Sequence, residues 1–313
     1  MKVCIFGAGG IGGYFGARLA QADIDVTFIA RGAHLDAILA DGLHVKSING
    51  DFVVHPARAT ALPEAVGPVD VVLCCVKSWQ VAEAADQMRA LVGPQTLVIP
   101  LLNGVEAHDI LARSLGAEHV LPGLCKLITM IDSPGHIRHA GAAPYLAFGE
   151  ANGRLSQRAQ DVARVFAEAR GMTVHLSRNI MTQLWRKFML IAPWSGIGAL
   201  TRSPIGVIRS LPETRTLVMD SIREVYDVAR AGGVPVEEKA MKETMAFIDA
   251  LPPEGTASMQ RDIMAGRPSE LHEQSGAVVR HGEKTNVPTP VNRLTYHGLL
   301  PQERMARKKL PAT

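Results

Sequence analysis

Short apolar runs alternate with longer segments of helical composition through the first half of the chain. The apolar runs are rich in Val, Ile, Leu and Phe, as buried strands are, and the segments between them are long enough for crossovers between parallel strands. We therefore predict an α/β fold with a Rossmann-like, doubly wound parallel sheet. The predicted strands span residues 2–6, 25–30, 71–76, 96–101 and 118–123, and the predicted helices span residues 11–22, 34–40, 80–91 and 106–115.

The end of this first half has a less regular pattern. Residues 135–149 contain two histidines and several glycines, which favours a β-hairpin. A helix over residues 156–170 and a short strand over residues 173–176 are expected to follow. These elements complete a predicted Rossmann-like domain over residues 1–177.

Strand signals disappear after about residue 178, and segments of helical composition are separated there by Pro and Gly. We predict an all-helical C-terminal domain over residues 178–313. The apolar faces of residues 216–229 and 241–251 suit either packing inside this domain or a homodimer interface, and both interpretations stay open. The predicted helices span residues 185–190, 213–232, 236–251 and 270–281.

Composition and charge exclude several classes of protein. The 313 residues exceed the usual size of one domain, and 47% hydrophobic with 20% charged residues is close to the globular average. A net charge of +3 with dispersed basic residues argues against an extended nucleic-acid surface. The apolar runs are too short to span a membrane. A protein with neither a nucleic-acid partner nor a membrane partner is expected.

Cysteine and histidine spacing argues against metal and disulfide chemistry. The four cysteines lack the paired spacing of a zinc site or a disulfide framework, so reduced thiols are expected. None of the eleven histidines forms a His-x-x-x-His pair, and we expect no metal site. The chain opens on a strand-like run without the pattern of a leader peptide, which favours a cytoplasmic protein.

A glycine pattern follows the first predicted strand. Gly7, Gly9 and Gly12 form Gly-x-Gly-x-x-Gly between this strand and the first helix. The first glycine permits a tight turn, the second lets backbone amides approach a pyrophosphate, and the third lets the helix pack closely on the strand. The helix N-terminus then faces the anion. The pattern predicts a dinucleotide site made by Gly7, Ala8, Gly9, Gly10, Ile11 and Gly12.

The end of the second predicted strand indicates which dinucleotide is bound. An acidic residue at this point holds the ribose 2′-hydroxyl of NAD, but the strand ends Phe-Ile-Ala-Arg31, without an acid. The Arg31 guanidinium is suited to a 2′-phosphate, which predicts NADP(H) as cofactor. The alternative is a solvated loop arginine.

Two further polar residues follow predicted strands at the sheet edge where ligands bind in such folds. Lys77 comes after the run 71–76, and Asn103 comes after the run 96–101. Each is a candidate contact of cofactor or substrate. The alternatives are an ordinary surface lysine and an Asn-Gly turn without chemistry.

Several motifs, taken in order, closely resemble the ketopantoate reductase family, also called 2-dehydropantoate 2-reductases. The resemblance covers nearly the whole chain, and the motifs together are far more specific than any one of them. They are the glycine loop with Arg31, Cys-Val-Lys-Ser-Trp-Gln at 75–80, Leu-Asn-Gly-Val-Glu at 102–106, Pro-Gly-His-Ile-Arg-His-Ala-Gly at 134–141, Leu-Trp-Arg-Lys-Phe at 184–188, and Ser-Met-Gln-Arg-Asp-Ile at 258–263 with Ser-Glu-Leu at 269–271.

The resemblance implies NADPH as hydride donor and assigns roles to individual residues. Lys187 falls at the family's catalytic lysine, which hydrogen-bonds the ketone oxygen and supplies a proton. Glu270 falls at the acid that binds a substrate hydroxyl, and Ser258 at the serine that helps to hold the carboxylate. Asn103 matches an asparagine at the junction of cofactor and substrate, and Lys77 matches a lysine beside it. A cation near the ketone oxygen is chemically apt, because hydride arrival leaves negative charge there.

One departure from the family concerns the substrate. Four and eight residues after Lys187, the pantoate-forming enzymes carry asparagines that position the substrate, whereas this chain has Ile191 and Ser195. Ser195 keeps one hydroxyl as a substrate-binding candidate, and Ile191 keeps no polar group. Pro193 in the same segment is expected to interrupt the helix.

Three functions therefore stay open. The first is NADPH-dependent reduction of 2-dehydropantoate to pantoate in pantothenate biosynthesis. The second is the same chemistry on another small 2-oxo acid, with a more apolar group facing Ile191. The third is an NADP-binding regulator that has lost turnover, against which the presence of both Lys187 and Glu270 argues.

Overall fold

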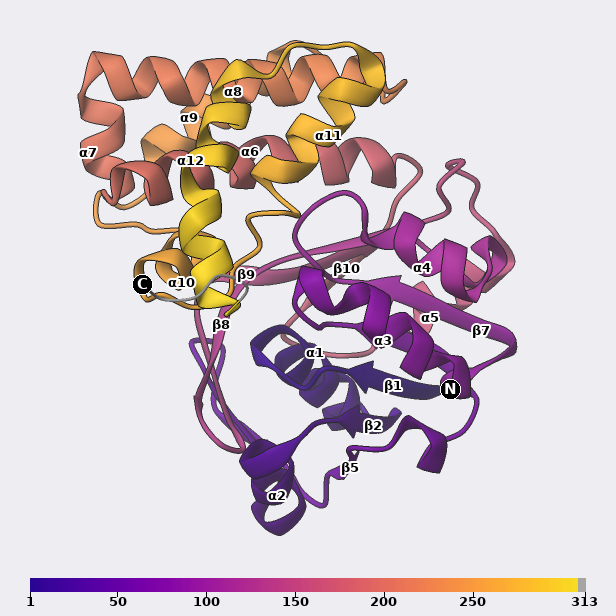
Figure 1. Cartoon of the computed structure of the whole chain (residues 1–313). Helices are drawn as coiled ribbons and strands as arrows, with labels where there is room; N and C mark the ends of the chain where they lie inside the picture. Colours follow the sequence, from indigo (N-terminus) through magenta and orange to yellow (C-terminus); the bar gives the residue numbers. More distant parts are fainter. Residues whose placement is uncertain (309–313) are drawn as a thin grey trace. The chain divides into compact units, whose positions relative to one another are not determined.

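The computed structural model describes residues 1–308, which fold into two compact units (Figure 1). The first unit holds residues 1–102 and 107–180. The second holds residues 103–106 together with the chain from Met181 onward. Residues 103–106 therefore belong with the helices of the second unit and not with the strand that precedes them in the sequence.

Five parallel strands form the central sheet of the first unit. They lie in the order β5 (Arg58–Thr60), β2 (Asp25–Ile29), β1 (Lys2–Phe6), β6 (Val69–Cys74) and β7 (Val92–Pro100). Phe6 pairs with Ile29 on one side and with Cys74 on the other, and Cys74 pairs with Pro100. Four strands thus end at one edge of the sheet, and the prediction of a Rossmann-like parallel sheet is confirmed.

Both faces of this sheet are buried, which explains its nearly continuous apolar strands. Val3 and Ile5 of β1 point into one core, and Cys4 and Phe6 point into another. The period-two alternation of strand side chains produces this division. The helices that supply the first core are α1 (Gly10–Gln21), α2 (Gly32–Asp41) and α5 (Gln157–Phe166), and those that supply the second are α3 (Val81–Met88) and α4 (Ala107–Leu115).

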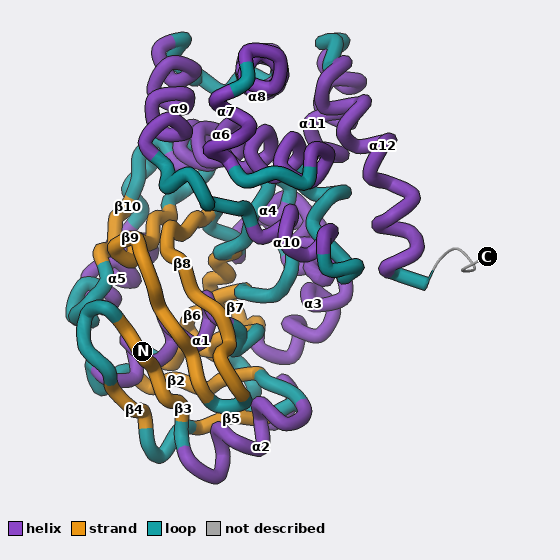
Figure 2. The backbone as a smooth tube through the Cα atoms, turned by 90° about the vertical axis from the view of Figure 1, so that its left-hand side faces the viewer, coloured by secondary structure: helices purple, strands orange, loops and turns teal. Residues whose placement is uncertain are grey.

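A second sheet in the same unit was predicted only in part, through the expected hairpin over residues 135–149 and the expected strand over residues 173–176. Its strands are β3 (Leu43–Ser47), β4 (Phe52–Val54), β8 (Gly123–Ser133), β9 (His136–Phe148) and β10 (Thr173–Leu176). Strand β9 pairs with β8 along its length and also with β3 and β10, and Figure 2 shows β8 and β9 as two long neighbouring strands. Helix α1 packs against both of them.

Two predictions in this region were wrong. Residues 118–123 form no strand, because a short 3-10 turn occupies Ala117–His119 and only Val120 makes a single bridge, to Val98 of β7. Residues 135–149 are not a complete hairpin, because they supply only β9, and the turn at Pro134 and Gly135 connects it to β8. Gly135 has a φ of 75°, which suits glycine at this turn.

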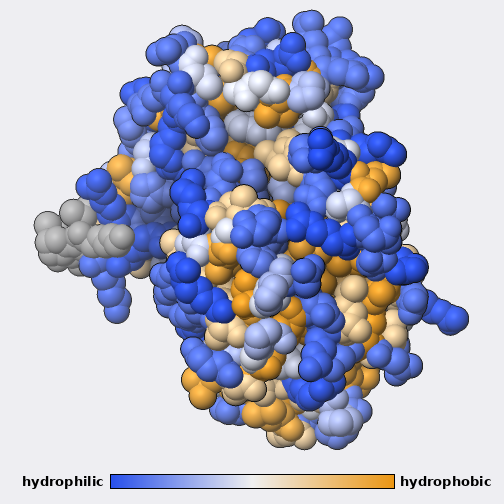
Figure 3. All heavy atoms as spheres, turned by 90° about the vertical axis from the view of Figure 1, so that its right-hand side faces the viewer, coloured by the Kyte–Doolittle hydropathy of each residue, from blue (hydrophilic) through white to orange (hydrophobic). Residues whose placement is uncertain are grey.

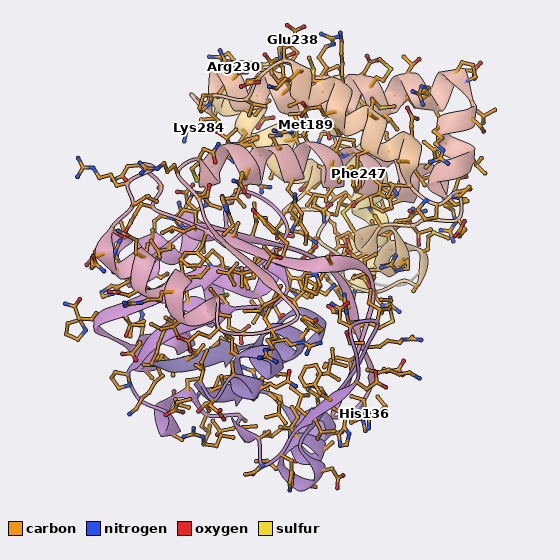
Figure 4. All side chains as sticks on the ribbon, turned by 180° about the vertical axis from the view of Figure 1, so that it is seen from behind. His136, Met189, Arg230, Glu238, Phe247 and Lys284 are labelled. Atoms are coloured by element: carbon orange, nitrogen blue, oxygen red, sulfur yellow. The ribbon has the colours of Figure 1, made fainter. Side chains whose placement is uncertain are left out.

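The second unit is all-helical in its described residues, as predicted. Its helices are α6 (Ile180–Thr201), α7 (Ile205–Ser210), α8 (Pro212–Ala231), α9 (Lys239–Ala250), α10 (Ser258–Met264), α11 (Ser275–Thr285) and α12 (Pro290–Ala306). Their buried apolar side chains form one main core that includes Phe188 and Met189 of α6 (Figure 4).

Two expectations for these helices are corrected. Helix α6 runs through Pro193 without interruption, since proline removes one backbone N–H while the neighbouring Met189 and Ala192 remain packed in the core. The segment predicted as a helix over 270–281 becomes helical only at Ser275. Residues 269–271 are instead held by Glu303 of α12 and by Arg307, which follows this helix, so Glu270 lies in a turn.

Two surface features bear on the predicted partners. In the described residues, every helix is either too short or too polar to cross a bilayer. Figure 3 shows hydrophobic residues interspersed with hydrophilic ones on the face it presents. The apolar face of α8 packs Val218, Ile222 and Val225 into its own unit, which supports the intramolecular interpretation for that helix. Phe247 of α9 is exposed (Figure 4), and a homodimer stays a prediction.

Candidate active site

The glycine loop after β1 leaves open space in front of the start of α1, and we call this loop the cradle. Gly7 has a φ of 100°, and a Cβ on Gly12 would lie 2.1 Å from the Gly7 carbonyl oxygen, so both positions require glycine. A Cβ on Gly9 would have no atom within 4 Å. The space in front of Gly9 is therefore open, and α1 begins at the next residue, Gly10, with its N-terminal amides nearby. These residues fit a dinucleotide phosphate.

His34, which the sequence reasoning missed, holds this loop in place. The Gly135 backbone N–H donates to His34 Nδ1 at 3.0 Å, so this nitrogen carries no hydrogen and Nε2 does. His34 Nε2 then donates to the carbonyl oxygen of Ala8 at 2.8 Å. The neutral imidazole thus ties the glycine loop to the β8–β9 turn. In the sequence it is an ordinary polar residue near a helix start, without a signal of its own.

Arg31 and Lys77 lie after β2 and β6, at the sheet edge that carries the glycine loop. Arg31 is exposed as the residue before α2, and one of its terminal nitrogens donates to Gln87 Oε1 at 2.7 Å. Lys77 is exposed too, with its ammonium 5.6 Å from the centre of the Trp79 ring. The edge therefore presents two cations to an anionic ligand.

In the second unit, Asn103 and Glu270 meet directly although 167 residues separate them in the sequence. Asn103 Nδ2 donates to Glu270 Oε2 at 3.1 Å, and Gln274 Nε2 donates to the same oxygen at 3.1 Å. Glu270 is 5% exposed. Two amides thus fix one oxygen of the buried carboxyl group for which the family resemblance predicts a role in substrate binding.

The loop that carries Asn103 is anchored by a charged pair. Arg280 donates to Glu106 Oε2 at 2.5 Å, and His281 Nε2 lies 3.5 Å from Glu106 Oε1. Burial raises the pKa of Glu106, but the nearby His281 ring and the hydrogen bonds and charge of Arg280 outweigh it and bring the pKa to about 2. Glu106 therefore stays ionised at neutral pH and holds residues 103–106 against α11.

Glu273 lies near the Glu106–Arg280 pair, but its pKa is shifted in the opposite direction. Its Oε2 is buried without a hydrogen-bond partner, and its backbone carbonyl oxygen would lie 2.9 Å from a Cβ on Gly104. Burial raises the pKa of Glu273 to about 7. The turn between Glu270 and α11 therefore combines a carboxyl group held by two amides with one that titrates near neutrality.

We expect the Glu273→Gln variant to be more stable than the wild type at pH 8 and equally stable at pH 4. The carboxyl pKa is higher in the folded chain, about 7, than its ordinary value of 4.5. Its contribution to stability is therefore complete below pH 4.5 and is lost as the pH rises to 7. The difference between the two pKa values corresponds to about 3 kcal/mol. An amide removes that loss, which we expect to raise Tm at pH 8 by about 6–12 °C.

Thermal unfolding at both pH values tests this expectation, with the exposed Glu254→Gln as the matched control. If the Tm of Glu273→Gln does not rise at pH 8, or rises equally at pH 4, burial does not raise the pKa of Glu273.

The remaining candidates lie on helices of the second unit. Lys187 is half-buried on α6, and no hydrogen bond or ion pair joins it to another described residue. Ile191 is half-buried against the helical core, and Ser195 is 2% exposed. Ser258 is half-buried at the first position of α10. The structure thus brings Asn103 to Glu270, and it gives Lys187 and Ser258 no bond to either of them.

His136, Cys4 and Cys74 lie outside the candidate site. His136 is exposed at the start of β9 (Figure 4), where its ring stacks on His44 with the centroids 4.6 Å apart. Burial raises the pKa of the Cys4 and Cys74 thiols to about 12. Across residues 1–308, no group of three or more His, Cys, Asp or Glu side chains has the arrangement of a metal site.

Comparison with known proteins gives matches along the whole chain. The family model "Ketopantoate reductase PanE/ApbA" matches residues 3–153, and "Ketopantoate reductase PanE/ApbA C terminal" matches residues 179–302. A 2-dehydropantoate 2-reductase of Mesorhizobium japonicum is 30% identical, with 93% of this chain and 94% of that protein covered.

Solved structures agree with this match. The crystal structure of a PanE/ApbA family ketopantoate reductase from Ralstonia eutropha is 32% identical and covers 98% of this chain and 100% of its own, with a TM-score of 0.89. A D-mandelate dehydrogenase solved with NADH and anilino(oxo)acetate is 21% identical, covers 98% of this chain and 99% of its own, and has a TM-score of 0.88. The latter likeness concerns the fold alone.

Proposed function

Because the chain belongs to the ketopantoate reductase family of oxidoreductases, we propose that it reduces 2-dehydropantoate to pantoate with NADPH, a step in pantothenate biosynthesis. The observation that carries the proposal is the 3.1 Å hydrogen bond between Asn103 and Glu270. It joins a motif from the first half of the chain to a motif from the second half within one folded unit. A cytoplasmic location is part of the same proposal.

The cradle around Gly9 and the cations at the sheet edge support NADPH as cofactor. The open space at Gly9 and the start of α1 suit the pyrophosphate, and Arg31 suits a 2′-phosphate. When bound, NADPH supplies a hydride to the ketone carbon. Lys77 adds positive charge beside this site.

We expect the Arg31→Ala variant to raise the KM for NADPH by about 10–100-fold, because charge-assisted bonds to the 2′-phosphate are lost. The KM for NADH should change by less than about threefold, since NADH carries a hydroxyl there. Steady-state kinetics with both cofactors measures the difference. The exposed Arg89→Ala on the same unit is the control. An equal change for both cofactors would exclude Arg31 as the residue that selects the phosphate.

Side chains of the second unit would bind the substrate and supply the proton. The Lys187 ammonium would stabilise the charge that grows on the ketone oxygen and then donate a proton to it, which completes the alcohol. Glu270, fixed by Asn103, would accept a hydrogen bond from a substrate hydroxyl, and the Ser258 hydroxyl would donate to the substrate carboxylate. A buried and fixed acceptor discriminates strongly for a hydroxyl.

A second candidate keeps this chemistry but changes the substrate. Ile191 is half-buried against apolar neighbours, and Ser195 is buried, so the positions that carry amides in pantoate-forming enzymes are more apolar here. This observation favours a 2-oxo acid with a more apolar side group. The shared fold of a mandelate dehydrogenase indicates that the fold alone does not select the substrate.

Steady-state NADPH oxidation with 2-dehydropantoate and a panel of other 2-oxo acids tests the proposal. A kcat/KM for 2-dehydropantoate far above the others would support pantoate formation. Preferential turnover of an apolar 2-oxo acid would support the second candidate. Tight NADPH binding with no turnover of any acid would instead indicate a nucleotide-binding regulator.

A further inference from the structure

The turn that carries Glu270 is held by a side chain from the last helix. The Ser269 backbone N–H donates to both carboxylate oxygens of Glu303 at 3.1 Å, and the Ser269 hydroxyl donates to Glu303 Oε2 at 2.5 Å. The Leu271 N–H in turn donates to the Ser269 hydroxyl oxygen at 3.2 Å. Backbone amides on both sides of Glu270 are therefore bonded, directly or through one hydroxyl, to Glu303.

Arg307 closes this network from the next turn of the chain. Its Nε donates to Glu303 Oε1 at 2.5 Å, and a terminal nitrogen donates to the Ser269 carbonyl oxygen at 2.8 Å. Ser269 thus has its N–H, hydroxyl and carbonyl oxygen bonded by two side chains of the C-terminal segment. Three groups fixed at one residue leave the following peptide little freedom.

Burial makes the network rigid. Glu303 is 2% exposed and Ser269 is fully buried, so the bonds are shielded from water. A buried carboxylate is tolerated only when it is paired and hydrogen-bonded, and here Arg307 pairs with it while Ser269 donates to it. The Arg307 side chain is 17% exposed and that of Glu303 is 1% exposed, so the pair is more buried than an ordinary surface salt bridge.

We propose that Glu303 and Arg307 are positioning residues, which set the Glu270 carboxyl group at the geometry needed for substrate. The inference rests on the proposed function, because Glu270 needs a fixed position only if it binds the substrate. Glu270 is then fixed from two sides: Asn103 and Gln274 hold its side chain, and Glu303 holds its backbone through Ser269. A displacement of about 1 Å at a reacting group lowers rates by about 10²-fold, so a distant anchor controls turnover.

The test compares Glu303→Gln, Arg307→Ala and Arg307→Lys with the exposed control Arg304→Ala on the same helix. Circular dichroism and thermal unfolding identify a temperature at which each variant is folded. At that temperature, kcat and KM for the best 2-oxo acid and the Kd for NADPH are measured. We expect Glu303→Gln and Arg307→Ala to lower kcat/KM for the acid by about 10–100-fold, with the Kd for NADPH within about twofold of wild type.

Arg307→Lys keeps the charge but loses the planar guanidinium that bonds Glu303 and Ser269 together, so it should retain more activity than Arg307→Ala. If Glu303→Gln does not fold, the two Arg307 variants decide. Folded variants with wild-type kcat/KM, or with NADPH binding weakened as much as turnover, would overturn the inference while the proposed function stands. A wild-type protein that turns over no 2-oxo acid would instead overturn the proposed function, and this inference with it.

Discussion

We expect the Lys187→Ala variant to reduce its 2-oxo acid about 10³-fold more slowly than the wild type, because general acid catalysis and charge stabilisation at an oxyanion each contribute factors of this order. The side chain lies half-buried on α6 and is bonded to no other described residue, so its removal should leave the fold intact. Single-turnover kinetics at saturating NADPH isolates the chemical step and measures the loss.

The matched control is Lys284→Ala, an exposed lysine on α11 (Figure 4). It should leave kcat within about twofold of wild type, as surface substitutions usually do. A Lys187→Ala variant with full kcat but a raised KM would assign Lys187 to substrate binding and remove it as the proton donor.

The second large effect is expected at Gly9. Its Cβ would meet no atom of the protein within 4 Å, and its φ of −70° suits any residue, so the Gly9→Ala variant should fold with an unchanged Tm. The added methyl group would occupy the space in front of the backbone amides, where we propose that the pyrophosphate binds. We expect the Kd for NADPH to rise by at least about 100-fold, equivalent to about 2.7 kcal/mol.

Two other glycines make this test specific. The Gly12→Ala methyl group would lie 2.1 Å from the Gly7 carbonyl oxygen, so this variant should lose Tm as well as NADPH binding. Gly298→Ala, at an exposed position inside α12, should leave NADPH binding unchanged and should not lower Tm, since its nearest neighbour is a flexible leucine 3.5 Å away and alanine favours the helix. Titration of NADPH fluorescence, together with thermal unfolding, separates the three cases. A Gly9→Ala variant that binds NADPH normally would remove the cradle from the proposed site.

The sequence predicted β1, β2, β6 and β7 of the central sheet because both faces of that sheet are buried, and it missed the short strand β5. Strands such as β1 and β6 must then be apolar throughout, and this pattern is visible without a structure. The second sheet was largely missed because the outer half of β8 is mostly exposed and mixes Thr129 and Asp132 with apolar residues. Such a strand is defined by its pairing with β9, which sequence patterns do not record.

The sequence predicted the residues of the candidate site, but it did not predict the residues that hold them in place. Asn103 and Glu270 were found through motifs, and the structure bonds them. Their anchors were not found: Glu106 pairs with Arg280, 174 residues away, and Glu303 reaches Ser269 across 34 residues. Contacts over such separations depend on tertiary packing alone. The helix expected from Glu270 onward failed for the same reason, because Glu303 holds this turn in a non-helical form.

The short excursion of residues 103–106 into the helical unit has a consequence for how the protein is made. Synthesis proceeds from the N-terminus, so Glu106 emerges from the ribosome long before its partners Arg280 and His281 exist. The sheet unit can acquire its core early, but this loop must wait, with an unpaired carboxylate, until most of the chain has been translated. Neither unit is a continuous stretch of polypeptide, and a ribosome stalled before α11 would display a folded sheet with an incomplete candidate active site.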